Sequence, residues 1–316
     1  MKDNKTKKTT GSVTNDICQR VTDRLVALME SGVNPWQKPW ASTGSDAAIS
    51  RSSGKPYSLI NQILLGFRPG EYLTFKQCKA EGGSVRKGAK GTQVIFWQPA
   101  RMTPLEKKDD EQPKADGAEV SDDEGDAPET VRWQGAILKA YTVFHVDDCV
   151  GIERRHTCEA NRRREFDPVE EAERVVSDYC GRSGVTLDII EGDRAFYRPS
   201  TDTVTVPSRQ QFAGNPQFYG TLFHELGHST GHESRLRRLK ADAFASESYS
   251  REELVAEITA ATCLAELGIN TSGTEKNSAA YLKAWIEFLK SDPRAIVVAA
   301  GKAEKAFRMI FNKDAA

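Results

Sequence analysis

The segment HELGH at residues 224–228 constrains the fold more than any other feature of this sequence. Its two histidines stand four residues apart, and on a helix such residues project from the same face, about one turn from each other. The neighbouring residues extend this segment into a helix that we predict over 217–232. Both imidazoles then lie close enough to share one metal ion.

Glu225 stands beside the first of these histidines, where its carboxylate can accept a proton from a metal-bound water. Zinc lowers the pKa of such a water to about 7, which yields a hydroxide that attacks a peptide carbonyl. His224 and His228 as ligands with Glu225 as general base are typical of a zinc metallopeptidase, and other divalent transition metals also suit these ligands. The alternative is a helix whose histidines only cap or pack.

A catalytic zinc normally has a third protein ligand and keeps one position open. His232 is a poor candidate if the helix ends at Gly231, since glycine favours a helix C-terminus. The helix predicted over 251–268 is a better source. We expect Glu253 to be the third ligand and Glu257 to contact one of the imidazoles without binding the metal. Glu257 as the third ligand is the alternative. The alternative is that both are ordinary surface charges.

The remaining patterns predict an α+β fold with two domains, the first mixed α/β and the second helical with a small sheet. Helical periodicity covers residues 15–31, 58–66, 168–184, 251–268, 277–290 and 294–312. β-forming residues mark strands at 71–75, 91–99 and 136–149, and a hairpin over 194–207 that turns near 200–202. In zinc peptidases an edge strand before the metal helix pairs with extended substrate, which would give this hairpin a role in proteolysis. Simple packing is the alternative.

Residues 101–130 separate two of these strands and hold 4 Lys+Arg against 11 Asp+Glu. Large apolar side chains are scarce there, so the segment cannot bury enough surface to offset its ordering entropy. We expect a disordered acidic insertion in a hairpin. It is either an inert loop or a weak electrostatic competitor for a basic surface.

Residues 1–100 hold 15 Lys+Arg against 7 Asp+Glu, which favours a polyanionic partner, although a solvated surface would show the same excess. Trp36 and Trp40 flank Lys38 in a proline-rich loop that offers flat rings for base stacking beside a cation for phosphate. Stacking requires unpaired bases, so single-stranded DNA is the expected partner. Further predicted contacts are Arg51, Lys55, Tyr57, Asn61, Lys76, Arg86, Lys87 and Lys90. Core packing is the alternative for the first two tryptophans, and it is our preferred interpretation for Trp97.

The six cysteines are scattered without a CxxC pair, so neither a disulfide framework nor a cysteine zinc site is expected. No apolar run approaches the ~20 residues that span a bilayer. Residues 1–14 are expected to form a flexible tail, and they lack the apolar stretch of a secretory signal. We expect a cytoplasmic protein without a membrane partner.

Several segments together resemble the ArdC family of plasmid antirestriction proteins, whose N-terminal domain is shared with TraC-type conjugative primases. The segments are GVNPWQKPW (32–40), GKPYSLIN (54–61), YLTFKQCKAEGGSVRKGAKGTQVIFW (72–97), HELGHSTGHESRLRR (224–238) and REELVAEITAATCLAELG (251–268). The resemblance implies an N-terminal single-stranded-DNA-binding domain and a C-terminal zincin-like metallopeptidase domain. We place these domains at 15–152 and 168–316, on either side of a charged linker, 153–167.

The resemblance also implies a role in protecting incoming plasmid DNA from host restriction during conjugation, with an unidentified host protein as the peptidase substrate. Tyr249, just before the ligand helix, is a candidate for stabilising the oxyanion. The alternative is a protein that coats entering single strands and keeps a zinc site only for structure. A primase-type accessory role lacks the acidic cluster that a polymerase needs.

Overall fold

The computed structural model describes residues 10–36, 47–99, 136–155, 168–239, 247–269 and 279–313. Within these ranges helices and strands mix in the α+β class that the sequence predicts. The predicted acidic insertion, Lys38 and Trp40 lie outside the described residues. No helix in the described part is long and apolar enough to cross a bilayer.

The N-terminal half is built around a four-stranded mixed sheet in the order β1-β2-β5-β4. Its strands are β1 (Ala48–Ser50), β2 (Gly70–Thr74), β4 (Thr92–Pro99) and β5 (Ala136–His145). β4 and β5 form the predicted antiparallel pair, in register from Thr92 opposite Val143 to Pro99 opposite Ala136. β1 runs parallel to β2 and was not predicted, because three residues are too few to show an alternating pattern.

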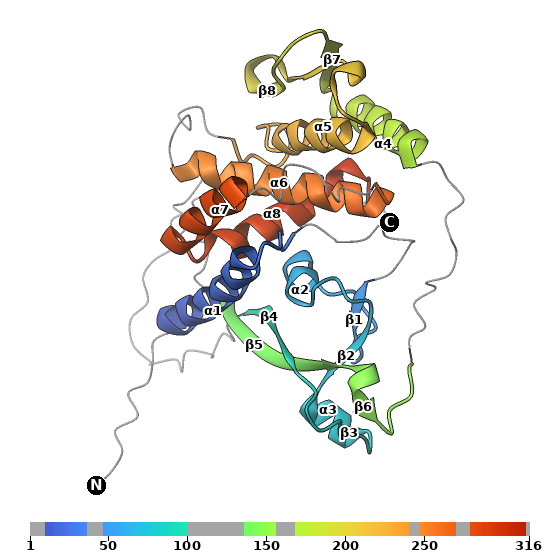
Figure 1. Cartoon of the computed structure of the whole chain (residues 1–316), viewed down its shortest axis with the longest axis vertical. Helices are drawn as coiled ribbons and strands as arrows, with labels where there is room; N and C mark the ends of the chain where they lie inside the picture. The colour runs from blue at the N-terminus through green and yellow to red at the C-terminus, as the bar shows by residue number, and fades with distance from the viewer. Residues whose placement is uncertain are drawn as a thin grey trace, which may run out of the picture.

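One long helix, two short helices and a second, two-stranded sheet complete the described part of this half. These elements are α1 (Thr10–Glu30), α2 (Leu59–Leu64), α3 (Phe75–Ala80), β3 (Ser84–Val85) and β6 (Cys149–Val150). β3 pairs with β6, and both lie with α3 at the lower end of the structure in Figure 1. Thr74 caps α3 through a reciprocal exchange with Gln77, which explains why the chain turns from β2 into a helix.

α1 begins at Thr10, inside the stretch predicted as tail, and ends where predicted. Its buried residues include Ile17, Val21 and Leu25, four residues apart, so they form one stripe along the helix. Gly32 has φ +84°, a conformation that glycine adopts at little cost, and it ends the helix.

The C-terminal half combines a three-stranded sheet with five helices among the described residues. The elements are α4 (Pro168–Ser183), β7 (Thr186–Ile190), β8 (Phe196–Arg198), β9 (Thr203–Pro207), α5 (Asn215–Ser229), α6 (Glu247–Leu267), α7 (Ala279–Ser291) and α8 (Ala295–Ile310). The sheet order is β7-β9-β8, with β8 antiparallel to β9 as the predicted hairpin requires. β7 was not predicted, because its side chains are largely exposed on both faces and leave no alternation.

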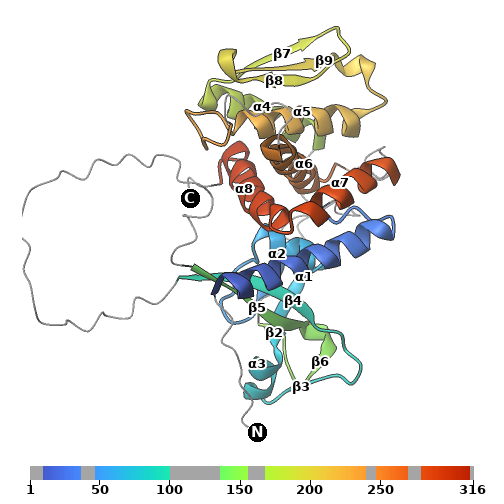
Figure 2. The ribbon, with the colours of Figure 1, turned by 90° about the vertical axis from the view of Figure 1, so that its left-hand side faces the viewer.

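The elements form layers along the long axis of the structure (Figure 2). The three-stranded sheet lies at one end, followed by α4 and α5, then by α6, α7 and α8. α1 and α2 come next, and the four-stranded sheet lies beyond them.

One hydrophobic core joins the two halves. It contains buried side chains from α1, β5, α6, α7 and α8, among them Leu25, Leu138, Leu254, Leu282 and Ile296. A second core lies between α4, α5, α6 and the three-stranded sheet. The first core shows that the N-terminal helices pack directly on the helices that follow the HELGH segment.

Candidate functional site

Helix α5 carries the HELGH segment and packs closely on α6. Pro216 stands in the first turn of α5, where its missing backbone N–H has no intrahelical partner to lose. Gly227 lies so near α6 that a Cβ there would be 3.3 Å from the Cα of Ala256. This glycine lets the two backbones approach, so that carboxylates of α6 reach the histidines of α5.

The structure brings three of the predicted ligands together. The Nε2 atoms of His224 and His228 lie 3.1 Å apart. Glu253 Oε2 lies 3.3 Å from His224 Nε2, and Glu253 Oε1 lies 3.4 Å from His228 Nε2. Among the described residues, these three form the one group of His, Cys, Asp and Glu side chains whose ligand atoms converge closely enough to hold an ion.

Burial disfavours charge on both imidazoles, but neighbouring carboxylates outweigh it. Burial lowers the pKa of His224, while hydrogen bonds to Glu253 and Glu257 produce a net rise. Burial likewise lowers the pKa of His228, and hydrogen bonds to Glu252 and Glu253 raise it to about 10. Burial raises the pKa of Glu253, but hydrogen bonds from both imidazoles bring it far below its usual range. The carboxylates therefore create an environment that favours positive charge between the two rings.

Each imidazole has its own carboxylate on the Nδ1 side. Glu257 Oε1 lies 3.3 Å from His224 Nδ1, which is within the range of an ion pair, although the angles there are not those of a hydrogen bond. Glu252 Oε1 lies 3.6 Å from His228 Nδ1, and the buried Arg238 donates to both oxygens of Glu252. The position of Glu257 is the one expected for it. The arginine was not predicted, since no local pattern shows which segment packs over α6.

Glu225 is buried, with 8% of its surface exposed. Burial raises the pKa of its carboxyl, whereas the charges of His224 and His228 and the Tyr197 backbone act in the opposite direction. A raised pKa suits a group that accepts and releases a proton near neutrality. β8, an outer strand of its sheet, packs on α5, the helix that carries this carboxylate.

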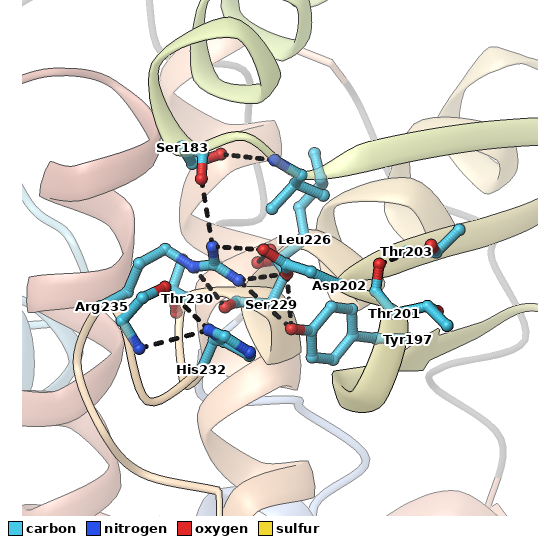
Figure 3. A network of polar contacts seen from close by, with 12 residues as sticks. Ser183, Tyr197, Thr201, Asp202, Thr203, Leu226, Ser229, Thr230, His232 and Arg235 are labelled. Carbon is cyan, nitrogen blue, oxygen red and sulfur yellow. Dashed lines mark hydrogen bonds and ion pairs between the residues drawn. The ribbon is translucent and has the colours of Figure 1, made fainter.

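A buried arginine fixes the segment after α5 to the three-stranded sheet (Figure 3). Arg235 donates to the two carboxylate oxygens of Asp202 at 2.5 and 2.9 Å, and to the Tyr197 hydroxyl at 3.2 Å. It also donates to the backbone carbonyls of Ser229 and Ser183. One side chain thus ties the end of the metal helix to the β8–β9 turn and to the end of α4.

Two other residues that the sequence analysis considered are His232, which it judged a poor candidate for a ligand, and Tyr249. His232 follows the end of α5, and its Nδ1 lies 2.8 Å from Ser234 Oγ, so it does not join the convergent ligand atoms. Tyr249 falls in the first turn of α6. Its side chain is outside the described part of the structure, and its role stays a prediction.

Trp36 and Tyr57 are buried, so neither ring is available for base stacking. Trp36 is 2% exposed and packs edge-on against Trp285, with ring centroids 6.0 Å apart. Tyr57 is 8% exposed and packs edge-on against Tyr72. For Trp36 the structure favours the core-packing alternative, and the predicted DNA contact of Tyr57 is wrong.

Arg51 and Asn61 are also buried and stabilise the N-terminal sheet. Arg51 pairs with the carboxylates of Glu71 and Glu81. Asn61 donates to the Ile95 carbonyl and accepts from the Ile95 N–H, both at 2.8 Å. Because β4 is an edge strand, this amide satisfies backbone groups that no further strand pairs. The predicted DNA contacts of both residues are wrong, since protein groups already occupy their polar atoms.

The basic side chains predicted on and around α3 and β3 are exposed, and these two elements pack on each other at one end of the structure (Figure 1). Phe75 and Lys79 were not predicted, but Phe75 is 50% exposed there, and Lys79 Nζ lies 5.3 Å from its ring centroid. We call this set the α3–β3 surface; its members are Phe75, Lys76, Lys79, Arg86, Lys87 and Lys90. Lys55 is also exposed. Trp97 is 39% exposed rather than buried, because an apolar strand does not show which of its ends the helices cover.

Two family models match this chain. The model for the N-terminal domain of anti-restriction factor ArdC matches residues 15–144. The model for a zincin-like metallopeptidase matches residues 171–302. The second match contains the three convergent ligands, and the first contains the α3–β3 surface.

Curated relatives match almost the whole chain. Two DNA primases TraC of Escherichia coli are 38% identical over 293 residues, but the chain spans only 19% and 26% of their lengths. The uncharacterized protein y4eC of Sinorhizobium fredii (strain NBRC 101917 / NGR234) is 32% identical over 299 residues, which cover 92% of this chain and 90% of y4eC.

Solved structures show a similar fold along the full chain. The Mn(II)-bound crystal structure of the antirestriction ArdC protein from plasmid R388 has a TM-score of 0.65 at 31% identity. That match covers 95% of this chain and 98% of the other. The metal-free structure of the same protein has a TM-score of 0.64 at 29% identity.

Proposed function

Because this chain belongs to the ArdC family of antirestriction proteins, we propose that it binds single-stranded DNA and protects incoming plasmid DNA during conjugation, and that it carries a metal-dependent hydrolytic site. An unidentified host protein is the proposed substrate of that site. The convergence of His224, His228 and Glu253 is the observation that carries the proposal. We propose the domain ranges 15–152 and 168–316 for the two activities.

The three ligands fit a divalent transition metal. Two imidazole nitrogens and one carboxylate are the protein ligands of many catalytic zinc sites, and the same donors also suit Mn²⁺. The related R388 protein has been crystallised with Mn(II). We propose Zn²⁺ as the resident metal, with Mn²⁺ as the alternative, held by His224, His228 and Glu253.

The side chains around the metal would each have a separate task. A bound Zn²⁺ supplies a water of lowered pKa and polarises a carbonyl. Glu225 would accept and return the proton, since burial raises the pKa of its carboxyl. Glu252 and Glu257 hold the Nδ1 sides of the rings, which leaves each Nε2 directed at Glu253. An extended peptide would add to β8 as a further strand.

Metal content tests the ligand assignment. Purified wild-type protein should retain about one equivalent of Zn²⁺ or Mn²⁺ after dialysis, as measured by inductively coupled plasma mass spectrometry. Glu253→Ala should lose it, whereas Glu225→Gln should keep it, because only the first removes a ligand. Glu287→Ala is the matched control, since that carboxylate lies on the surface of α7. Full metal content in Glu253→Ala would reassign the third ligand.

Antirestriction assays separate a hydrolase from a DNA-coating protein with a structural metal site. The measurement is the efficiency of conjugation into a restricting host relative to a non-restricting one. If hydrolysis is required, Glu225→Gln loses protection while metal content and DNA binding stay at wild-type levels. If the metal site is only structural, Glu225→Gln protects as well as wild type, and the coating alternative stands.

We propose the α3–β3 surface as the single-stranded-DNA contact. The surface combines one exposed ring with five exposed cations, of which Lys79 lies over the ring, so a base can stack on Phe75 while the cations neutralise the flanking phosphates. The nearby carboxylates of Glu81 and Asp148 pair with arginines outside this surface. The surface therefore keeps its positive charge.

Fluorescence anisotropy with a labelled single strand tests this surface. Phe75→Ala should weaken binding by about 1–3 kcal/mol, the usual effect of losing one stacked base. Lys87→Gln combined with Lys90→Gln should reduce the dependence of affinity on salt, since each phosphate contact contributes about −0.7 to the log–log slope. Phe96→Ala is the control, because Phe96 is comparably exposed but lies on β4. A loss confined to Phe96→Ala would move the contact to the four-stranded sheet.

A further inference from the structure

A chain of contacts leads from the metal ligand His224 to α7. Glu257 Oε1 faces His224 Nδ1 at 3.3 Å, and the Tyr281 hydroxyl donates to Glu257 Oε2 at 3.0 Å. The glutamate is thus held between a ring nitrogen on α5 and a hydroxyl on α7. Its carboxylate cannot rotate without losing one of these contacts.

The same chain continues into the N-terminal half. Tyr281 packs edge-on against Trp285, with centroids 6.2 Å apart, and Trp285 packs edge-on against Trp36 at 6.0 Å. Trp36 is 2% exposed, and its Nε1 has no hydrogen-bond acceptor in the described part of the chain. Burial and the neighbouring charge of Glu257 raise the pKa of the Tyr281 hydroxyl. Trp285 therefore lies between the ring that holds Glu257 and the ring of Trp36.

The other histidine is supported differently. Glu252 faces His228 Nδ1, and Arg238 holds Glu252 through two hydrogen bonds. Arg238 also donates to the Gly227 carbonyl, so this support stays within the C-terminal half. Within the described ranges, a side chain from the N-terminal half takes part in the support of His224 and not in that of His228.

We propose that Tyr281 is a positioning residue for the metal ligand His224, and that Trp36 holds Tyr281 in place through Trp285. This proposal rests on the proposed function, because it takes the metal centre as its premise. A carboxylate that accepts from Nδ1–H fixes the tautomer in which Nε2 is free to bind a metal. The N-terminal half thereby contributes to metal affinity without providing a ligand.

Metal affinity provides the first test. The dissociation constant for Zn²⁺ is measured by competition with a chromogenic chelator, on the full-length protein. Tyr281→Phe keeps the ring and removes the hydroxyl, and it should weaken binding about three- to tenfold, since a direct partner of a ligand contributes about 10–100-fold. Trp36→Phe should act in the same direction by a smaller factor. Tyr72→Phe is the control, because it removes a tyrosine hydroxyl that donates to the Arg68 carbonyl, in the N-terminal sheet and remote from the metal.

Histidine ring ¹⁵N spectra provide a reading that a general loss of stability would not reproduce. The ring signals of His224 should shift in Tyr281→Phe and in Trp36→Phe, while those of His228 keep their wild-type positions. Thermal unfolding establishes that each variant is folded. If Trp36→Phe does not fold, Trp285→Phe tests the same link.

The outcomes separate this proposal from the one on which it rests. Wild-type affinity and unshifted His224 signals in Tyr281→Phe would overturn the positioning role while leaving the metal centre intact. Equal shifts of both histidines would also overturn it, since the proposed support is specific to one ring. Retention of metal by His224→Ala would instead refute the metal centre itself.

Discussion

Replacing Arg235 with alanine should destabilise the C-terminal half and loosen the segment after the metal helix. The guanidinium is 6% exposed and is the bidentate partner of Asp202, whose side chain is 25% exposed. The change leaves that carboxylate without its counter-ion, removes the arginine donor from the Ser183 carbonyl, and leaves the Ser229 carbonyl with the His232 N–H. We expect a cooperative loss of stability rather than a local rearrangement.

The size of the loss follows from the burial of the pair. Removing one member of a buried ion pair costs about 3–5 kcal/mol. The exposed quarter of Asp202 allows water to solvate the orphaned carboxylate, which places the expected cost near the lower limit, at about 3 kcal/mol. At roughly 2–4 °C per kcal/mol, Tm should fall by about 6–12 °C.

Urea and thermal denaturation, followed by far-ultraviolet circular dichroism, measure this loss. Arg174→Ala is the matched control, because Arg174 is 67% exposed and pairs with Glu171 on the surface of α4. Its effect should stay within about 0.5 kcal/mol. The partner variant is Asp202→Asn, since residue 202 has φ +49° and asparagine tolerates that conformation.

A double-mutant cycle decides whether the pair itself is responsible. The double variant with Arg235→Ala and Asp202→Asn should be about 2 kcal/mol more stable than the sum of the single effects predicts, because the orphaned charge is gone. Additive single effects would refute the reasoning. They would mean that Arg235 acts by packing alone.

Three further predictions concern acid stability and the N-terminal sheet. Hydrogen bonds from the buried guanidinium lower the pKa of Asp202 below 3.8, so its contribution is complete above about pH 4. That contribution is lost as pH falls through the lowered pKa, so the Tm of wild type should approach that of Asp202→Asn as pH falls below about 4. Gly70→Ala should cost about 3–5 kcal/mol in urea denaturation, because φ is +121° and the new Cβ would lie 2.4 Å from His145 Nε2. Gly66→Ala, with φ +64° and no atom within 4 Å, should cost only about 1 kcal/mol, and equal effects would contradict the role of the ring. Asn61→Ala should cost about 3 kcal/mol, since it leaves two buried backbone groups at the edge of β4 unpaired, and a loss under about 1 kcal/mol would show that water replaces the amide.

The sequence predicted those features that depend on spacing within one segment. Helices with a continuous apolar stripe, such as α1 and α4, were confirmed, as was the β8–β9 hairpin. The expectation that Glu253 and Glu257 lie at the histidines also followed from spacing, because the two residues share one helix face. Their positions agree with that expectation, and metal ligation stays a prediction.

Features that depend on contacts between distant segments could not be predicted. The proline-rich segment around Trp36 has the composition of an exposed loop, yet this ring is buried because α7 happens to supply Trp285 opposite it. Arg51 counts as one more cation in a basic stretch until Glu71 and Glu81 are seen beside it. Local charge therefore overstated the DNA contacts, since it does not distinguish a solvated cation from a paired one.

The core that joins α1 to α6, α7 and α8 has a consequence for the chain if it is cut between residues 155 and 168. Each piece would present a broad apolar face that only the other piece matches, so a nicked protein should persist as a tight non-covalent heterodimer. The pieces expressed separately should aggregate alone and recover solubility when mixed. Fragment complementation would thus make the partnership of the two halves visible without any DNA or metal.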